Sequence, residues 1–217
     1  MSTNKSKIAV IGLGHIGKVV ATNLIKGNRP VIVASRKIQD AKSFAQQAGN
    51  LATALEVSDA IKEADMVLLS VSFGTIKELL SSRGSEFKGK IIVDPSNPIA
   101  PDGNGGFKKI VGEKESAGEI IAGLLPAGAK LVKAFGTLSA ASLSSASRSK
   151  PDAAVLFYAS DDVSVNGKVE ELIKDSGFDP MHVGGIDQSI RIEVFGDLHE
   201  FGALGKVVTL AEVEAKV

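Results

Sequence analysis

Short apolar runs alternate with segments of helical period along most of the chain. The apolar runs occupy residues 7–12, 30–35, 66–72, 90–95, 130–135 and 153–160. Between them we expect helices at residues 15–26, 38–48, 56–63, 74–82 and 116–125. Because the runs lack alternating polar residues, they are typical of strands that helices cover on both faces. The pattern predicts a doubly wound α/β fold built on a parallel sheet.

Several further stretches complete the expected organisation. Residues 50–53 are expected to form a short edge strand, and the glycine- and charge-rich residues 101–116 a mobile loop near the site. Apolar spacing predicts a helix within residues 161–178, followed by a short strand at 180–183. In the tail, a helical spacing predicts one long packing helix that carries Val194, Leu198, Phe201, Leu204 and Val208.

The charge balance and the residue types argue against several classes of function. The 25 Lys and Arg residues equal the 25 Asp and Glu residues, so neither nucleic acid nor a membrane surface is expected as a partner. Cysteine is absent, which excludes disulfides and thiolate metal sites and fits a reducing cytoplasm. The polar residues 1–7 and the short apolar run behind them predict an unexported, cytoplasmic protein. The three scattered histidines show no metal-binding spacing, and we expect no metal.

The first apolar run leads into GLGHIG, residues 12–17, which has the spacing G-x-G-x-x-G between an expected strand and an expected helix. In a dinucleotide-binding loop, Gly12 permits the tight turn, Gly14 lets the backbone approach a pyrophosphate, and Gly17 lets the helix pack closely on the strand. The N-terminus of the helix attracts anions through its N–H groups and its dipole. The motif therefore indicates a dinucleotide site, against the alternative of a glycine-rich turn without a ligand.

The second apolar run ends in Ser35, Arg36 and Lys37. An NAD-binding enzyme usually carries Asp or Glu at this position, where an acidic side chain would repel a 2′-phosphate. Arg36 can instead donate hydrogen bonds to such a phosphate, and Ser35 offers a hydroxyl. We therefore expect NADP(H) rather than NAD(H) as the cofactor. The alternative is a solvated basic helix start that Asp40 partly offsets.

Two later loops follow strands that we expect beside the same crevice. Ser70, Val71 and Ser72 could line the cofactor riboses. Asn97 can both donate and accept hydrogen bonds, as a carboxamide ligand requires, and Pro95 and Pro98 stiffen its loop. An Asx turn closed by Asn97 is an equally good interpretation.

No residue stands out as a general acid or base. His15 lies inside the glycine loop, His182 ends a short expected strand, and His199 and Glu200 are expected at the surface or core edge of the tail helix. We therefore assign no catalytic residue. The absence is consistent with an acceptor that is itself a redox cofactor, because its ring takes the hydride and the protein only aligns two planar rings.

The chain resembles a known family, the NADPH-dependent coenzyme F420 reductases, together with the related cytosolic domain of STEAP-type ferric reductases. The resemblance rests on IAVIGLGHIGKVVA, ASRK, IIVDPSNPI, LLPAGAKLVKAFGTL and GFDPMHVGGID, in this order. It implies an NADP-binding Rossmann domain, placed at residues 1–146. It further implies a small C-terminal α/β lobe, residues 147–217, with the acceptor site and dimer contacts. The implied activity is that of an NADP-dependent oxidoreductase, usually a homodimer, that transfers a hydride directly between NADP(H) and a small-molecule acceptor, F420, FMN or FAD.

The motifs and the resemblance together give one set of expected cofactor-binding residues. Its members follow the expected strands of the N-terminal sheet, and the resemblance places the last three near the nicotinamide. The set is Gly12, Leu13, Gly14, His15, Ile16, Gly17, Ser35, Arg36, Lys37, Ser70, Val71, Ser72, Asn97, Pro98, Ala134, Phe135 and Gly136.

The sequence departs from the family pattern at two positions. Gly136 stands where relatives carry a polar residue, and Ser72 stands where a proline is common. Both departures leave cofactor binding intact but put the acceptor in doubt. The alternatives are a non-catalytic NADP(H)-binding redox sensor and a reductase of another small acceptor, such as a ferric chelate, a quinone or an imine.

Overall fold

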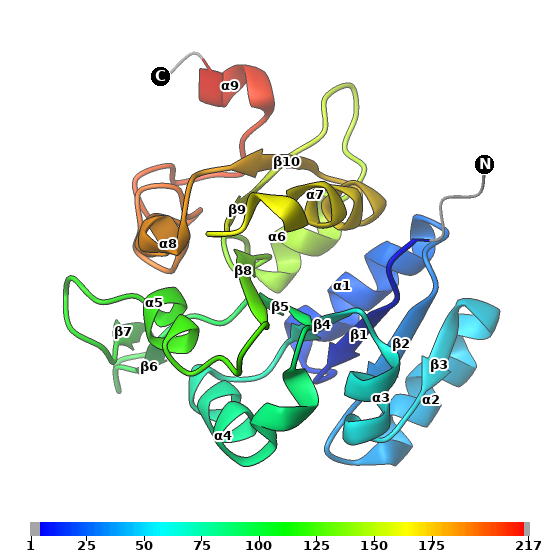
Figure 1. Cartoon of the computed structure of the whole chain (residues 1–217). Helices are drawn as coiled ribbons and strands as arrows, with labels where there is room; N and C mark the ends of the chain where they lie inside the picture. The colour runs from blue at the N-terminus through cyan, green and yellow to red at the C-terminus, as the bar shows by residue number, and fades with distance from the viewer. Residues whose placement is uncertain (1–4, 215–217) are drawn as a thin grey trace.

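An eight-stranded sheet forms the centre of the protein (Figure 1). The structure, a computed structural model, describes residues 5–214. The sheet has the order β10-β9-β8-β5-β4-β1-β2-β3. Its strands are β1 (Ile8–Ile11), β2 (Val31–Ala34), β3 (Ala52–Ala54), β4 (Met66–Leu69), β5 (Ile91–Asp94), β8 (Lys130–Ala134), β9 (Val155–Ala159) and β10 (Asp179–His182). All neighbouring strands are parallel except β8 and β9.

Helices cover both faces of this sheet. They are α1 (His15–Lys26), α2 (Ile38–Ala48), α3 (Val57–Glu63), α4 (Phe73–Arg83), α5 (Ala117–Ala122), α6 (Ala140–Ser145), α7 (Asn166–Asp175), α8 (Ser189–Ile192) and α9 (Leu210–Glu214). Short 3-10 turns lie at Gly49–Leu51, Gly84–Phe87, Val163–Val165 and Ile186–Gln188. Successive residues of β1 enter opposite cores, Val10 beside α1 and Ile11 beside α3 and α4. The predicted doubly wound α/β architecture is thereby confirmed.

Most expected elements are present within a few residues of their predicted ends. The first two expected helices match α1 and α2, and β3 is the predicted edge strand. No helix among residues 5–214 is both long and apolar enough to cross a membrane. The N-terminal strands and helices thus follow the hydrophobic pattern of the sequence.

The predicted long helix in the tail is wrong. After α8 the chain forms successive turns, and a helix begins again only at Leu210. Two glycines hold these turns in contact with other backbone: a Cβ on Gly196 would lie 2.3 Å from the Arg191 oxygen, and one on Gly202 would lie 1.7 Å from the Gly196 oxygen. Close backbone contacts that exclude any side chain outweigh the helical spacing of the apolar residues. Phe201, expected in the core, is 63% exposed.

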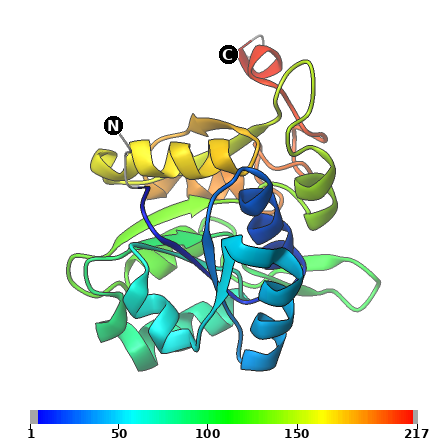
Figure 2. The same cartoon turned by 90° about the vertical axis from the view of Figure 1, so that its right-hand side faces the viewer.

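Two other expectations need correction. Residues 101–116 are not a plain loop, because β6 (Ile99–Pro101) and β7 (Phe107–Lys109) form an antiparallel hairpin. The run at 153–160 departs from the expected all-parallel order, because β9 runs antiparallel to β8 through two residue pairs, whereas β10 is again parallel to β9. A continuous apolar run predicts that a strand is buried on both faces but carries no information about its direction. The C-terminal segment from α7 onward lies in the upper half of both views, with α8 next to α5 (Figures 1 and 2).

Candidate functional site: the carboxyl edge of the sheet

The glycine loop lies where the order of the sheet reverses. The chain passes from β1 outward to β2 and β3, and then returns to β4 on the other side of β1. Ligands of doubly wound folds bind at such a switch point, beyond the carboxyl ends of the strands. A cavity of about 430 Å³ opens there, lined by Gly12, Gly14, Ser35, Arg36, Lys37, Asp40, Ser70, Val71, Ser72 and Thr75. The structure therefore brings together predicted residues from three separate loops.

A side chain would meet different surroundings at each glycine of the motif. Gly12 has φ +96°, and a Cβ there would lie 2.3 Å from the Ser70 oxygen. A Cβ on Gly17 would lie 1.9 Å from the Gly12 oxygen, so α1 could not pack as closely on the turn. A Cβ on Gly14 would meet nothing within 4 Å. The first and third glycines are thus needed by the fold, whereas the second leaves open space at the cavity.

Among residues 5–214, no side chain caps the positive end of α1. Gly14 is the N-cap of this helix, and the first turn holds no acidic residue. By contrast, α4, α5 and α6 each begin at a serine whose side chain accepts a backbone N–H. Uncapped N–H groups with a favourable dipole attract an anion. The start of α1 therefore fits the pyrophosphate of a dinucleotide.

Arg36 and Lys37 lie at the carboxyl end of β2 and are exposed to solvent. In the part of the chain that the structure describes, no ion pair engages either side chain. Arg36 also lines a second cavity of about 330 Å³, whose walls include Val57 and Leu79. A cation beside an uncapped helix start suits a phosphate. These residues fit the 2′-phosphate of NADP(H), with the second cavity, whose walls are partly apolar and also carry Glu56 and Arg83, next to it.

The loop after β4, residues 70–72, contributes fewer side-chain groups to the cavity than expected. Ser72 caps α4, because its hydroxyl accepts the Thr75 N–H at 3.3 Å and lies 2.9 Å from the Thr75 hydroxyl. Val71 is half-buried beside the glycine loop, and a Cβ on Gly12 would lie 2.7 Å from Val71 Cγ1. This loop shapes the wall of the cavity chiefly through its backbone and Val71.

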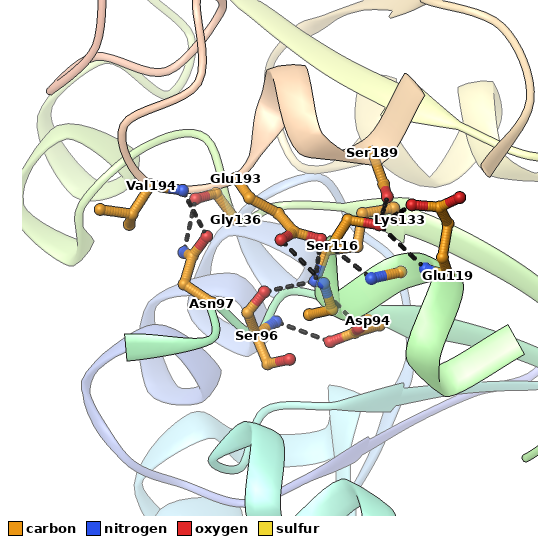
Figure 3. A network of polar contacts seen from close by, with 12 residues as sticks. Asp94, Ser96, Asn97, Ser116, Glu119, Lys133, Gly136, Ser189, Glu193 and Val194 are labelled. Carbon is orange, nitrogen blue, oxygen red and sulfur yellow. Dashed lines mark hydrogen bonds and ion pairs between the residues drawn. The ribbon is translucent and has the colours of Figure 1, made fainter. Parts of the chain in front are cut away.

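Asn97 connects two other parts of the protein. Its Nδ2 donates to the Gly136 oxygen at 3.0 Å, and its Oδ1 accepts the Val194 N–H at 2.7 Å (Figure 3). The Asx turn in this loop belongs to Asp94, whose Oδ1 accepts the Ser96 N–H at 2.7 Å. Both ends of the Asn97 amide are therefore engaged within the protein.

Close packing explains why a glycine occupies position 136. A Cβ at this position would lie 2.7 Å from the Pro95 oxygen, so the loops after β5 and β8 touch here through their backbones. The preceding Phe135 is buried and has φ +64°, which is unusual for a residue with a side chain. The departure from the family pattern at Gly136 thus goes with close packing of two loops.

A buried ionic cluster lies beneath these loops (Figure 3). Lys133 Nζ is 2.9 Å from Asp94 Oδ2 and 3.7 Å from Glu193 Oε1, and it also donates to the Ser96 oxygen. Glu193 accepts the N–H groups of Ala117 and Gly118, each at 2.9 Å. Burial raises the pKa of Glu193, while Lys133 and the two N–H groups oppose that rise.

The sequence reasoning missed this cluster. The signal that could have found part of it is the occurrence of Asp94 and Lys133 within apolar runs, because charged residues are seldom fully buried unless paired. The two are paired residues in the register of β5 and β8. Glu193, by contrast, lies about one hundred residues from Asp94, in a segment wrongly expected to be helical.

His199 and Glu200 are buried, contrary to the expected position at the surface or core edge of a helix. His199 Nε2 lies 3.0 Å from the Gly136 oxygen, and its Nδ1 accepts the Phe201 N–H at 3.0 Å. A carbonyl can only accept, so the neutral ring must carry its proton on Nε2. Burial lowers the pKa of His199. Glu200 accepts from the Ser139 N–H and, at 2.6 Å, from the Ser142 hydroxyl at the start of α6.

The remaining predicted residues fall into two groups. His15 is exposed and Ile16 half-buried at the start of α1. Leu13, Pro98, Ala134 and Phe135 are buried, so their side chains belong to the core or to packed loops. His182 stacks on Tyr158, with ring centroids 4.9 Å apart. The geometry therefore places the open, ligand-accessible part of the site at the loops after β1, β2 and β4.

Comparison with known proteins identifies relatives of this chain. Residues 7–98 match the family described as NADP oxidoreductase, coenzyme F420-dependent. The chain is 27% identical to the metalloreductase STEAP3 of Rattus norvegicus over 187 residues, which are 86% of this chain and 36% of that protein. It is 34% identical to the F420-dependent NADP reductase of Methanocaldococcus jannaschii over 104 residues, 43% of this chain and 46% of that protein. The chain thus spans less than half the length of each of these curated relatives.

A solved structure resembles the whole chain. The hypothetical protein SMa0349 from Sinorhizobium meliloti superposes with a TM-score of 0.82 at 29% identity, covering 96% of this chain and 97% of that one. The similarity to this solved structure therefore includes the C-terminal part of the chain. The resemblance inferred from the glycine loop and the later motifs is confirmed: residues 7–98, which contain β1, the glycine loop and Arg36, match the F420-dependent NADP oxidoreductases.

Proposed function

We propose that this chain is an oxidoreductase that binds NADP(H) in the crevice between β1 and β4 and transfers a hydride between it and a deazaflavin or flavin ring. The single observation that carries the proposal is the uncapped start of α1 facing a cavity that Arg36 also lines. The match of residues 7–98 to the F420-dependent NADP oxidoreductases supports it.

Different residues of the crevice would bind different parts of the cofactor. The N–H groups at the start of α1 would bind the pyrophosphate, and the space above Gly14 lets it approach the backbone. Arg36 would bind the 2′-phosphate, with Ser35 and Lys37 beside it. The second cavity that Arg36 lines, with Val57 and Leu79 as apolar walls and Glu56 and Arg83 at its polar side, would take the adenine.

The nicotinamide would then extend along the carboxyl edge toward the loops after β5 and β8. NADP(H) supplies a hydride at its nicotinamide ring when it is bound. The role of Asn97 and Gly136 is to give that ring a fixed wall, since both are held by contacts within the protein. No side chain of the crevice needs to move a proton if the acceptor ring draws its proton from water.

The nature of the acceptor depends on the second half of the chain. The M. jannaschii relative is named for F420, and the rat relative is named a metalloreductase. F420 is the first candidate, followed by FMN or FAD and by a ferric chelate, a quinone or an imine. A non-catalytic NADP(H) sensor is the candidate from another class, because Gly136 offers no side chain to an acceptor.

We also propose that residues 147–217, of which 215–217 lie outside the described residues, form a small lobe that carries the acceptor site and contacts a second copy of the chain. Phe195 and Phe201 on this segment are 52% and 63% exposed and offer apolar surface to a second copy. Sedimentation equilibrium tests whether two copies associate. We expect a mass twice that of the chain, and a monomer at all concentrations would contradict the proposed dimer.

The experiment that tests the function is a panel of acceptors. Oxidation of NADPH by the purified protein is followed with F420, FMN, FAD, a ferric chelate, quinones and cyclic imines, each with and without protein. We expect turnover with F420 or a flavin. Tight binding of NADPH without turnover of any acceptor would favour the sensor, and absence of binding would reject both proposals.

A further inference from the structure

The C-terminal segment of residues 193–199, which we name the clamp, contacts the two loops beyond β5 and β8. These loops are residues 95–98 and 135–137. The clamp follows α8 and carries Glu193, Val194 and His199. Besides the Ala117 and Gly118 N–H groups that Glu193 accepts and the Arg191–Asp197 ion pair, these three residues contact the end of the site where the nicotinamide is proposed to lie. Within the described residues, neither the glycine loop nor Arg36 is among their side-chain partners.

The first contact of the clamp is ionic and fully buried. Glu193 is 2% exposed, and its Oε1 lies 3.7 Å from the Lys133 ammonium group. That group also donates to the Ser96 oxygen and pairs with Asp94. Figure 3 shows Lys133 between the Glu193 carboxylate and the loop that holds Ser96 and Asn97. The position of the loop 95–98 is thereby tied to Glu193 through one lysine.

The second set of contacts holds a single carbonyl. The Gly136 oxygen lies 3.0 Å from Asn97 Nδ2 and 3.0 Å from His199 Nε2. Asn97 in turn accepts the Val194 N–H. A carbonyl with two side-chain donors has both lone pairs satisfied. The loop 135–137 is thus fixed by two donors, one from the other loop and one from the clamp.

The backbone around Gly136 needs such support. Phe135 has φ +64°, and the loops approach so closely that a Cβ on Gly136 would lie 2.7 Å from the Pro95 oxygen. Conformations of this kind persist only where the surrounding contacts impose them. A loop held in this way has one position rather than several, which is what alignment of two rings for hydride transfer requires.

We propose that Glu193 and His199 are positioning residues that act through Lys133 and the Gly136 carbonyl to fix the wall against which the nicotinamide lies. Neither residue touches the cofactor in this account. The inference rests on the proposed function, because the wall has a role only if NADP(H) binds in the crevice. It predicts that the clamp governs the nicotinamide end of the site and leaves the adenosine end unchanged.

The test separates the two ends with two ligands. Adenosine 2′,5′-bisphosphate reports on the adenosine end alone, and NADPH reports on both. Glu193→Gln removes the charge that faces Lys133, and His199→Ala removes one donor to the Gly136 carbonyl. For either variant we expect affinity for the bisphosphate within about twofold of the natural protein, because its site shares no contact with the clamp. We expect kcat with NADPH to fall about 10- to 100-fold, with a smaller change in KM.

A spectroscopic readout does not depend on turnover. The fluorescence of the nicotinamide changes when the ring is held in a fixed, dry position, and we expect that change to be smaller in both variants. His199→Gln keeps a donor of similar reach and should restore most of the lost signal. Asp175→Asn, which weakens the ion pair of Arg29 at the amino end of β2, is the control for general loss of stability.

The outcomes distinguish failure of the inference from failure of the proposed function. If the natural protein binds NADPH while both variants retain its kcat and its nicotinamide fluorescence, the clamp does not position the ring. Parallel loss of bisphosphate and NADPH binding would assign a merely structural role. If the natural protein binds no NADPH, the proposed function is wrong and the inference falls with it. Should one variant fail to fold, the other still decides.

Discussion

The two halves of the carboxyl edge of the sheet differ in how their polar groups are satisfied. Around β1 and β2, the start of α1 has no side-chain cap and Arg36 has no carboxylate partner among residues 5–214. Around β5 and β8, Asp94, Lys133 and Glu193 are buried and paired with one another. One half leaves its charged groups exposed, and the other half buries its charged groups in contact with groups of opposite charge.

This difference separates the parts of the site by the task that each performs. Groups that bind a charged ligand must be accessible before the ligand arrives, and groups that hold a loop in place must be satisfied already. The exposed half suits recognition of phosphates. The paired half suits the fixed geometry that hydride transfer needs.

The largest expected effect is on the paired half. Lys133→Met removes the cation that pairs with both Asp94 and Glu193 and leaves them facing a buried apolar side chain. Breaking a buried ion pair in this way costs about 3–5 kcal/mol of unfolding free energy. The control is Lys130→Met on the same strand, because Lys130 is 38% exposed and pairs with Asp162 at the surface, where such pairs contribute about 0–1 kcal/mol. Urea denaturation measures both, and equal losses would contradict the comparison.

The next largest effect should differ between two glycines of the same motif, Gly17 and Gly14. Gly17→Ala places a methyl group against the Gly12 oxygen, and we expect a loss of about 1–3 kcal/mol in unfolding free energy. Gly14→Ala meets nothing within 4 Å, so stability should change little. Its methyl group would stand where the pyrophosphate approaches, and affinity for NADPH should fall by about tenfold. A Gly14 variant that binds normally would argue that the ligand does not approach α1.

The smallest effect concerns pH. The pKa of His199 in the folded protein is lowered from 6.5 by burial, so the unfolded chain takes up the proton first as the pH falls. The contribution of the neutral His199 ring to the unfolding free energy is therefore fully present above pH 6.5, and it is lost as the pH falls through the lower pKa of the folded state. Protonation would also place an Nδ1–H against the Phe201 N–H.

His199→Gln removes this titration while keeping a hydrogen-bond donor. The unfolding free energy of the natural protein should fall relative to that of the variant as the pH is lowered from about 7 to about 5, by at most about 1.4 kcal/mol per pH unit. Denaturation curves at several pH values measure this difference. Identical pH profiles would mean that His199 titrates normally.

Much of the exposed half could be predicted from the sequence because its signals are local. The glycine motif, the strand before it and Arg36 after the next strand lie within about thirty residues, and the steric need for Gly12 and Gly17 follows from their spacing. The parallel order of the first strands follows from short apolar runs separated by helical segments.

The paired half could not be predicted in the same way. Its contacts join Asp94, Lys133 and Glu193, which are far apart in the sequence, and the position of Glu193 depends on turns that Gly196 and Gly202 impose. The helical spacing of the tail residues pointed to a different structure. Burial of His199 likewise depends on contacts with Gly136 that no local pattern encodes.

The measurement that tests the central claim most directly is calorimetric titration of the natural protein and of Arg36→Ala with NADPH and with NADH. Charge-assisted hydrogen bonds to a phosphate contribute about 1.5–3 kcal/mol, so the natural protein should bind NADPH about 10- to 150-fold more tightly than NADH. In Arg36→Ala, the affinity for NADPH should fall to near that for NADH, which should itself change little. Equal binding of both nucleotides by the natural protein, or binding of neither, would contradict the account.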